Sequence, residues 1–163
     1  MKTPALALIL GIFLAFGLHA ADVSFLVIET GLPEETEKNQ QSGLWESALL
    51  DVFFEAGHIV SNAPIMRLNA KLDGELPEAA EAELEMALEG GAEFFIVAML
   101  NYMTNSGSSG EWPREISLLL FRTEPYKKIY EQKITGRNYR NTRELFDNLK
   151  KIVVGLVSRL NDR

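Results

Sequence analysis

The sequence contains no cysteine, and this absence excludes several kinds of chemistry at once. A disulfide scaffold, a thiolate zinc site, a catalytic thiol and a thiol-linked lipid anchor all need that residue. We therefore do not expect a lipoprotein. In other respects the 163 residues are typical of a globular protein, with 47% hydrophobic and 24% charged residues, which argues against disorder and fibrous structure.

Histidine is also scarce, and its scarcity limits catalysis. His19 lies in the leader described below, so His58 is the one histidine outside it. A metal site would need mainly carboxylate and other oxygen ligands, and a Ser-His pair would have one candidate base. The sequence also lacks a Walker loop, a dinucleotide fingerprint, a zincin motif and kinase elements. We therefore expect a protein that is not an enzyme, with no catalytic residue, no metal ligand and no cofactor.

The first 20 residues have the pattern of a signal peptide. Lys2 supplies a positive start, residues 5–17 are apolar, and the segment ends in the small residue Ala20. We expect cleavage after Ala20, leaving residues 21–163 as one exported, periplasmic α/β domain with a net charge of −8 instead of −7, because Lys2 is the one charged residue removed. The apolar run is shorter than the ~20 residues that span a bilayer, so retention as an anchor is the weaker alternative.

The rest of the chain alternates predicted strands and helices. Apolar runs predict strands at 23–29, 58–60, 92–100, 116–121 and 127–135, and helical spacing predicts helices at 44–56, 78–89 and 142–160. The order β-α-β-α-β-β-β-α indicates an α/β (α+β) fold with a single mixed sheet of about five strands and three helices. The nearly unbroken apolar run 92–100 is expected at the sheet centre, and the polar strand 127–135 near an edge.

Four single residues carry local predictions. Ser42 is expected to cap the first helix, and Gly57 to end it in a left-handed conformation. Trp45 falls on the apolar stripe of that helix and is expected in the core. Gly155 lies inside the last helix, where glycine is unfavourable, and this favours close packing at that position.

Four segments in series carry a family resemblance. They are VSFLVIETG, LWESALLDVFFEAGHIVSNAPI, LEMALEGGAEFFIVAML, and ISLLLFRTEPYKKIYEQKITG together with LFDNLKKIVVGLVSRL. Their order resembles the periplasmic α/β domain shared by the TolB amino-terminal domain, the penicillin-binding-protein activator LpoB and the curli-secretion protein CsgG. The resemblance implies an envelope adaptor or assembly part that binds other proteins without an active site. It assigns no functional residue.

Charge is unevenly distributed along the chain. Residues 21–113 carry 17 acidic and 3 basic groups, whereas residues 114–163 carry 6 acidic and 12 basic groups. Opposite faces could meet different partners, steered by these fields. The favoured alternative is local cancellation, with the acidic second helix packed beside the basic hairpin and the last helix. Nucleic acid is a poor partner for an exported protein of net charge −8.

The partner-binding surface is predicted at five residues. Trp112 ends the loop 104–113, and an exposed aromatic there is a plausible anchor, although folding back over the sheet edge is an equal alternative. The later segment mixes basic and aromatic groups suited to an acidic protein. Its chosen residues are Arg137, Tyr139, Arg140 and Arg143. Together with a sheet edge, these residues predict an envelope protein as the partner.

Two other functions stay open at this point. Glu81, Glu85 and Glu89 line one face of the second helix, and a solvated face is favoured over an ion site. A small-molecule or carboxylate-based enzymatic domain is the competing class, and a cleft with clustered carboxylates would favour it. A homo-oligomer that hides an apolar sheet or helix face is the third alternative.

Overall fold

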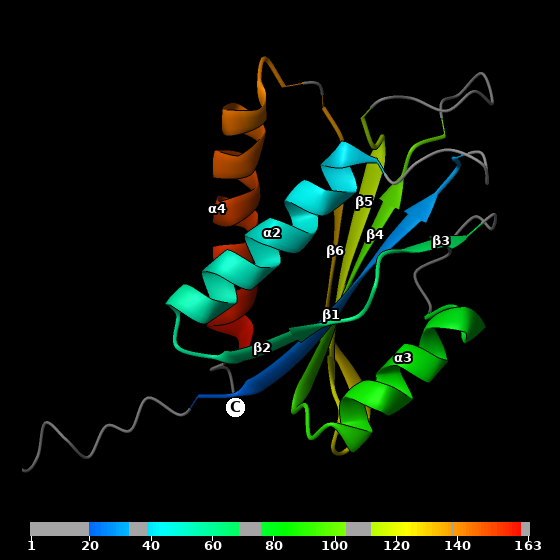
Figure 1. The fold of residues 1–163 in the computed structure, drawn as a ribbon, viewed down its shortest axis with the longest axis vertical. Helices are drawn as coiled ribbons and strands as arrows, with labels where there is room; N and C mark the ends of the chain where they lie inside the picture. The colour runs from blue at the N-terminus through cyan, green and yellow to red at the C-terminus, as the bar shows by residue number, and fades with distance from the viewer. Residues whose placement is uncertain (1–19, 33–38, 69–75, 104–111, 138, 161–163) are drawn as a thin grey trace, which may run out of the picture.

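The computed structural model describes residues 20–32, 39–68, 76–103, 112–137 and 139–160 (Figure 1). The predicted leader, apart from Ala20, and residues 104–111 of the predicted binding loop lie outside this part of the chain. The elements, in chain order, are β1 (Asp22–Thr30), α2 (Gln40–Glu55), β2 (Ile59–Asn62), β3 (Met66–Leu68), α3 (Glu78–Glu89), β4 (Phe94–Asn101), β5 (Glu115–Arg122), β6 (Lys127–Thr135) and α4 (Thr142–Leu160).

The strands of the described ranges form one mixed sheet of six strands, with the order β2-β1-β4-β5-β6 and with β3 beside β1. β1 runs parallel to β2, β3 and β4, whereas β5 is antiparallel to both β4 and β6. The predicted class and the three helices are confirmed, as are the central position of β4 and the edge position of β6. β3 is the additional strand, and its three residues are too few to show a periodic pattern.

Helices cover both faces of the sheet. α2 and α4 lie on one face and α3 on the other (Figure 1). Residues alternate between the faces along each strand, so Phe25 and Ile96 pack under α2 and α4 while Leu26 and Phe95 pack on the α3 side. β1 and β4 are buried on both faces, which explains their continuous apolar runs.

The first helix begins four residues earlier than its apolar spacing predicts. Asn39 is the N-cap, because its side chain accepts a hydrogen bond from the backbone N–H of Gln41 at 2.9 Å. The prediction that Ser42 caps this helix is therefore wrong. Ser42 lies inside the first turn and is fully buried.

Other local predictions have mixed outcomes. Trp45 is buried, with 1% of its surface exposed, and Gly57 follows α2 with φ +87°, so both predictions are confirmed. Close packing at Gly155 is wrong, because a Cβ there would meet no atom within 4 Å. Among the described helices, none is long and apolar enough to cross a membrane.

Candidate functional site

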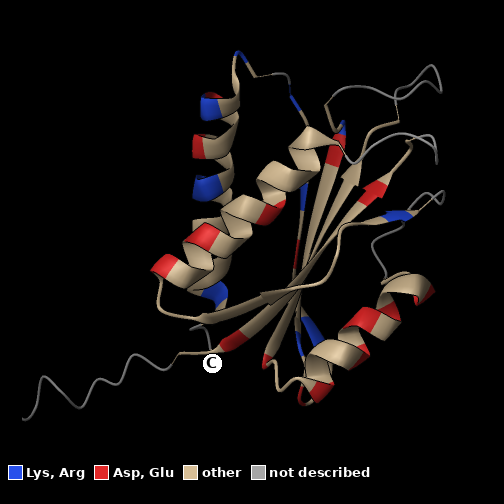
Figure 2. Ribbon diagram, in the orientation of Figure 1, with Lys and Arg blue, Asp and Glu red and all other residues tan. Residues whose placement is uncertain are grey.

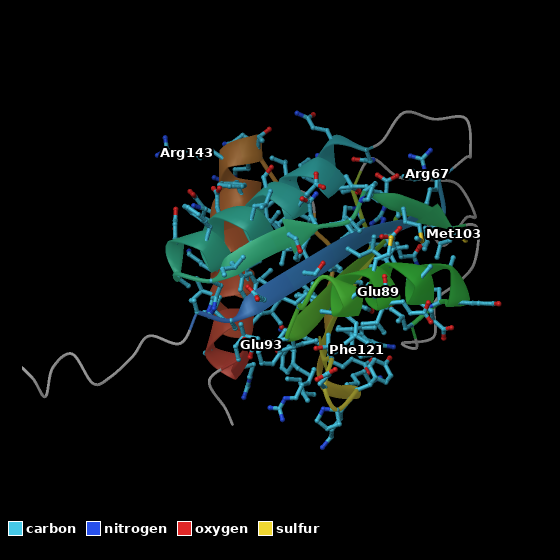
Figure 3. The ribbon with its side chains drawn as sticks, turned by 60° about the horizontal axis from the view of Figure 1, so that its bottom comes forward. Arg67, Glu89, Glu93, Met103, Phe121 and Arg143 are labelled. Carbon is cyan, nitrogen blue, oxygen red and sulfur yellow. The ribbon has the colours of Figure 1, made fainter. Side chains whose placement is uncertain are left out.

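The predicted binding residues gather at one end of the sheet. β1 and β4 end there, and so do β3 and β6, while antiparallel β5 begins there. Figure 3 shows Arg67 of β3 and Met103, just after β4, at this end, with Glu93 at the opposite end. The first turn of α2 lies against the same end, because Ser42 contacts Tyr102. Ligand sites of open α/β sheets commonly lie at the carboxyl ends of parallel strands.

Three of the five predicted residues form one cluster, which we call the Trp112 cluster: Trp112, Arg137 and Tyr139. The Trp112 and Tyr139 rings lie 5.7 Å apart between centroids and are tilted by 48°. The Arg137 guanidinium carbon lies 4.9 Å from the centre of the Tyr139 ring, within cation–π range. Trp112 and Tyr139 are half-buried and pack against the core, and the role of Trp112 as a binding anchor stays a prediction.

Two neighbouring contacts fix the positions of the Trp112 cluster. The Tyr139 hydroxyl donates to Asn148 Oδ1 of α4 at 2.7 Å. At the end of β6, a side chain on Gly136 would overlap the carbonyl oxygen of Pro113. The missing side chain at Gly136 therefore lets the segments that carry Arg137 and Trp112 approach closely.

A small cavity of about 10 Å³ lies beneath the Trp112 cluster, large enough for about one water molecule. Its lining includes the three cluster residues together with Gln41, Trp45 and Leu149. Gln41 is 7% exposed, and its Oε1 atom has no hydrogen-bond partner. An unpaired buried polar atom is costly, and a donor as small as one water molecule fits this space.

The other two predicted residues, Arg140 and Arg143, are exposed at the start of α4. The backbone N–H of Arg140 donates to Glu144 Oε2 at 3.0 Å, and Asn141 Oδ1 accepts from the N–H of Glu144 at 2.9 Å. The Asn141 side chain thus caps the first turn of α4, and the Glu144 side chain holds the residue before the cap. The two guanidinium groups thus stand on an ordered turn that follows Tyr139 directly in the chain.

Sequence reasoning missed a buried polar group at the same end of the sheet, which we call the Glu29 network: Glu29, Asn39 and Arg67. Glu29 is fully buried, and its Oε2 accepts from Arg67 Nη2 at 2.6 Å and from Nε at 3.0 Å. Its Oε1 accepts from the backbone N–H of Asn39 at 2.8 Å. Because both carboxylate oxygens have partners, the network fastens β3 and the start of α2 to β1. The sequence signal was a carboxylate that ends an otherwise apolar strand.

Tyr102 and Ser42 form a second buried polar contact beside this network. Their hydroxyl oxygens lie 2.9 Å apart. Burial raises the pKa of Tyr102 well above its usual range, so its hydroxyl stays protonated at neutral pH. Ser42 neighbours Gln41 in the first turn of α2, and this turn therefore links the Glu29 network to the Trp112 cluster.

Two of the larger grooves lined by described residues lie elsewhere. One, of about 510 Å³, is lined by Glu93, Arg122 and Glu124 among others. The other, of about 560 Å³, lies between α3 and the β1–β2 edge, with Asp22 and Glu83 in its lining. Within the described ranges, no three His, Cys, Asp or Glu residues are placed to hold a metal ion.

His58 lies at the end of the sheet opposite the Trp112 cluster, in a buried position. Its Nδ1 accepts a hydrogen bond from the backbone N–H of Ala21 at 3.2 Å, and its ring lies 5.9 Å from that of Phe53. Burial lowers the pKa of His58 below 6.5, partly opposed by the nearby charge of Glu93. These contacts give His58 a structural role at the start of β1.

The acidic and basic parts of the sequence meet where α2 and α4 share one face of the sheet, whereas the acidic α3 lies on the other face. Figure 2 shows acidic residues along α3 on one face and a mixture of basic and acidic residues along α4 on the other. The expected packing of α3 beside the last helix is therefore wrong, whereas α3 does share a core cluster with β5 of the hairpin, through Ala80 and Phe121. Lys150 of α4 instead forms ion pairs of 3.3 Å with Asp51 and Glu55 of α2. Glu81, Glu85 and Glu89 are exposed along α3.

The chain belongs to the protein family described as "Uncharacterised protein", whose model matches residues 23–153. No curated protein matches the sequence.

Several solved structures are similar to the chain. A PelC dodecamer from Paraburkholderia phytofirmans has 13% sequence identity and a TM-score of 0.49, over 86% of this chain and 87% of that one. The LpoB C-terminal domain from Salmonella enterica has 11% identity and a TM-score of 0.45, over 82% and 94%. Protein XCC0632 from Xanthomonas campestris has 11% identity and a TM-score of 0.40, over 88% and 85%. LpoB is thus among these structures, whereas the likeness to TolB and CsgG stays a prediction.

Proposed function

We propose that the protein is an exported, non-enzymatic component of the cell envelope that binds a partner protein through the Trp112 cluster, with Arg140 and Arg143 at its border. The leader pattern supports export, and the absence of cysteine supports export without a lipid anchor. The observation that carries the proposal is the cluster itself, in which an indole and a phenol pack with tilted rings and a guanidinium lies over the phenol.

The composition of the cluster favours a protein partner. Trp, Tyr and Arg are the residues most enriched where protein interfaces have their strongest contacts. Here the rings and the cation hold one another in place, and the Tyr139–Asn148 hydrogen bond adds to that order. Less side-chain entropy is therefore lost when a partner binds.

The size of the cavity argues for a surface contact instead of an enclosed ligand. Small-molecule sites usually measure about 300–1,000 Å³, whereas the space under the Trp112 cluster is about 10 Å³. The basic border made by Arg140 and Arg143 favours an acidic segment in the partner.

The test is photo-crosslinking in the native envelope, with a photoreactive residue in place of Arg140 and identification of the attached protein. We expect one partner to be recovered in stoichiometric amounts. Trp112→Ala should reduce its recovery by about tenfold or more, because hot-spot truncations cost at least about 2 kcal/mol. Arg143→Glu, combined with the photoreactive residue at position 140, should reduce recovery through charge reversal.

Two controls make the result specific. Lys151→Glu reverses an exposed charge farther along α4 and should leave recovery unchanged. Trp112→Phe keeps an aromatic ring and should retain part of the binding. Unchanged recovery with Trp112→Ala, in a variant whose circular dichroism matches that of the natural protein, would refute this location of the surface.

A further inference from the structure

The two edges of the sheet differ in length and regularity. On one side, β2 and β3 have four and three residues and are separated by residues 63–65, which include Pro64. Such short, interrupted edges resist the addition of another strand. On the other side, β6 runs over nine residues, with a bulge between Tyr130 and Lys128 opposite Leu120 and Phe121. β6 is therefore the long edge of the sheet.

The backbone of β6 has a defined outward side. The N–H of Gly136 donates to the carbonyl oxygen of Arg114 at 2.8 Å. Backbone groups alternate in direction along a strand, so every second residue counted back from Gly136 points its N–H and C=O at β5. These residues are Ile134, Gln132 and Tyr130. The backbone groups of Glu131, Lys133 and Thr135 point outward. Among the described strands, β6 is paired with β5 alone and ends the sheet on this side. This edge therefore offers a row of outward donors and acceptors.

The side chains of β6 divide between the two faces of the sheet. Tyr130, Gln132 and Ile134 lie on the face of α2 and α4, since they stand opposite core residues of β5 on that face. Glu131 and Lys133 lie on the α3 face and are exposed. Glu131 Oε2 lies 2.8 Å from Lys128 Nζ in an exposed ion pair, which is of small energetic value.

When two copies of this edge pair with each other, one register brings opposite charges together and also joins the backbone donors and acceptors. In an antiparallel pair, residues whose backbone groups point outward must lie opposite each other. When the two strands are copies of β6, this condition places the two-fold axis at a single residue. An axis at Glu131 or at Lys133 would set identical charges opposite each other. An axis at Gln132 sets Glu131 opposite Lys133 twice, and it sets Tyr130 opposite Ile134 twice on the other face. Opposite charges and aromatic with β-branched side chains are favourable cross-strand pairs.

We propose that β6 is a dimerisation edge, where it pairs antiparallel with β6 of a second copy about Gln132, so that the two sheets become one continuous sheet. Lysines on an edge strand oppose pairing when like charges meet. In this register each Lys133 meets a carboxylate, and Glu131 lies between Lys128 of its own strand and Lys133 of the second copy. The half-buried Tyr130 and Ile134 side chains become covered.

The test uses the absence of natural cysteine, which makes Gln132→Cys the sole thiol of the chain. Residues at the centre of a non-hydrogen-bonded antiparallel pair have Cα atoms about 4.5 Å apart, within disulfide range. Mild oxidation of the purified variant should therefore give a covalent dimer on a non-reducing gel. Lys127→Cys, near the hairpin, is the matched control and should give little dimer.

Charge reversal tests the register in a second, independent way. Glu131→Lys and Lys133→Glu should each weaken the dimer by about tenfold in sedimentation analysis, because two like-charge pairs replace two opposite-charge pairs. The double variant with both changes should restore the dimer. A monomer at all concentrations, a dimer that neither single change affects, or Gln132→Cys crosslinking no better than Lys127→Cys would overturn the proposal. Binding of a different protein's strand to a monomeric chain would overturn it too.

Discussion

At the scale of single residues, two glycines have opposite surroundings. Gly155 lies inside α4 with open space around it, so Gly155→Ala should raise the free energy of unfolding by about 0.5–1 kcal/mol through its higher helix propensity. Gly136→Ala should lower it by about 1–3 kcal/mol, because the new methyl group overlaps the Pro113 backbone. Urea unfolding of the two variants checks both, and a loss of stability with Gly155→Ala would contradict this account of α4.

His58 predicts a pH dependence of stability. Since its pKa is lowered below 6.5 in the folded protein, the unfolded chain binds a proton first as the pH falls. Its contribution to stability is therefore complete above pH 6.5 and is lost as the pH falls from 6.5 through the folded pKa. His58→Asn keeps an acceptor for the Ala21 N–H but does not titrate.

The measurement for His58 is urea unfolding of the natural protein and of His58→Asn at several pH values between 8 and 5. The natural protein should lose stability relative to the variant only in the acidic part of that range. Parallel curves for the two proteins would show that His58 titrates alike in the folded and unfolded states. Titration of the carboxylates changes the stability of both proteins equally, so the difference between the two curves reports the titration of His58.

Predictions for single residues succeeded where hydrophobicity determines the position of the side chain. They failed where a polar partner far away in the sequence determines it. Trp45 was predicted in the core from helical spacing alone. Glu29 and Tyr102 could not be assigned, because their partners, Arg67 and Ser42, are 38 and 60 residues away in the chain. The roles of the five predicted binding residues stay predictions, although Trp112, Arg137 and Tyr139 do lie together.

At the scale of elements, the Glu29 network holds the shortest strand in place. Arg67→Met leaves the buried Glu29 carboxylate without its cation and should cost about 3–5 kcal/mol of unfolding free energy. Replacing both residues, Glu29→Leu with Arg67→Met, should cost less than Arg67→Met alone, since no buried charge is left unpaired. Chemical unfolding of the two variants gives the comparison. A double variant less stable than the single one would refute it.

Element boundaries show why sequence patterns alone were insufficient near the candidate site. Gln40, Gln41 and Ser42 are polar, and Gly43 disfavours helix, so nothing in the local sequence indicates the first turn of α2. The turn forms because Asn39 caps it and bonds to Glu29, and because buried Ser42 meets Tyr102. The long apolar elements, by contrast, were predictable from their own periodicity.

At the scale of the whole molecule, the sequence predicted which strands lie at the centre and at the edge of the sheet better than it predicted which helices share a face. A central apolar β4 and an outer β6 follow from hydrophobicity, because burial on two faces requires continuous apolar residues. The placement of α3 on the face opposite α4 follows from crossover topology, which no local pattern records. If two copies join along β6 as we propose, each assembly carries two Trp112 clusters, and a partner with two matching sites would gain avidity.

The hydrogen bond between Ala21 and His58 bears on the timing of maturation. Ala20 is exposed, but Ala21 is only 3% exposed and its nitrogen is held by the imidazole. A peptidase that cuts between these two alanines needs an extended, accessible backbone on both sides of the bond. Removal of the leader that we propose would thus have to precede folding, and a precursor that folded first would be slow to process.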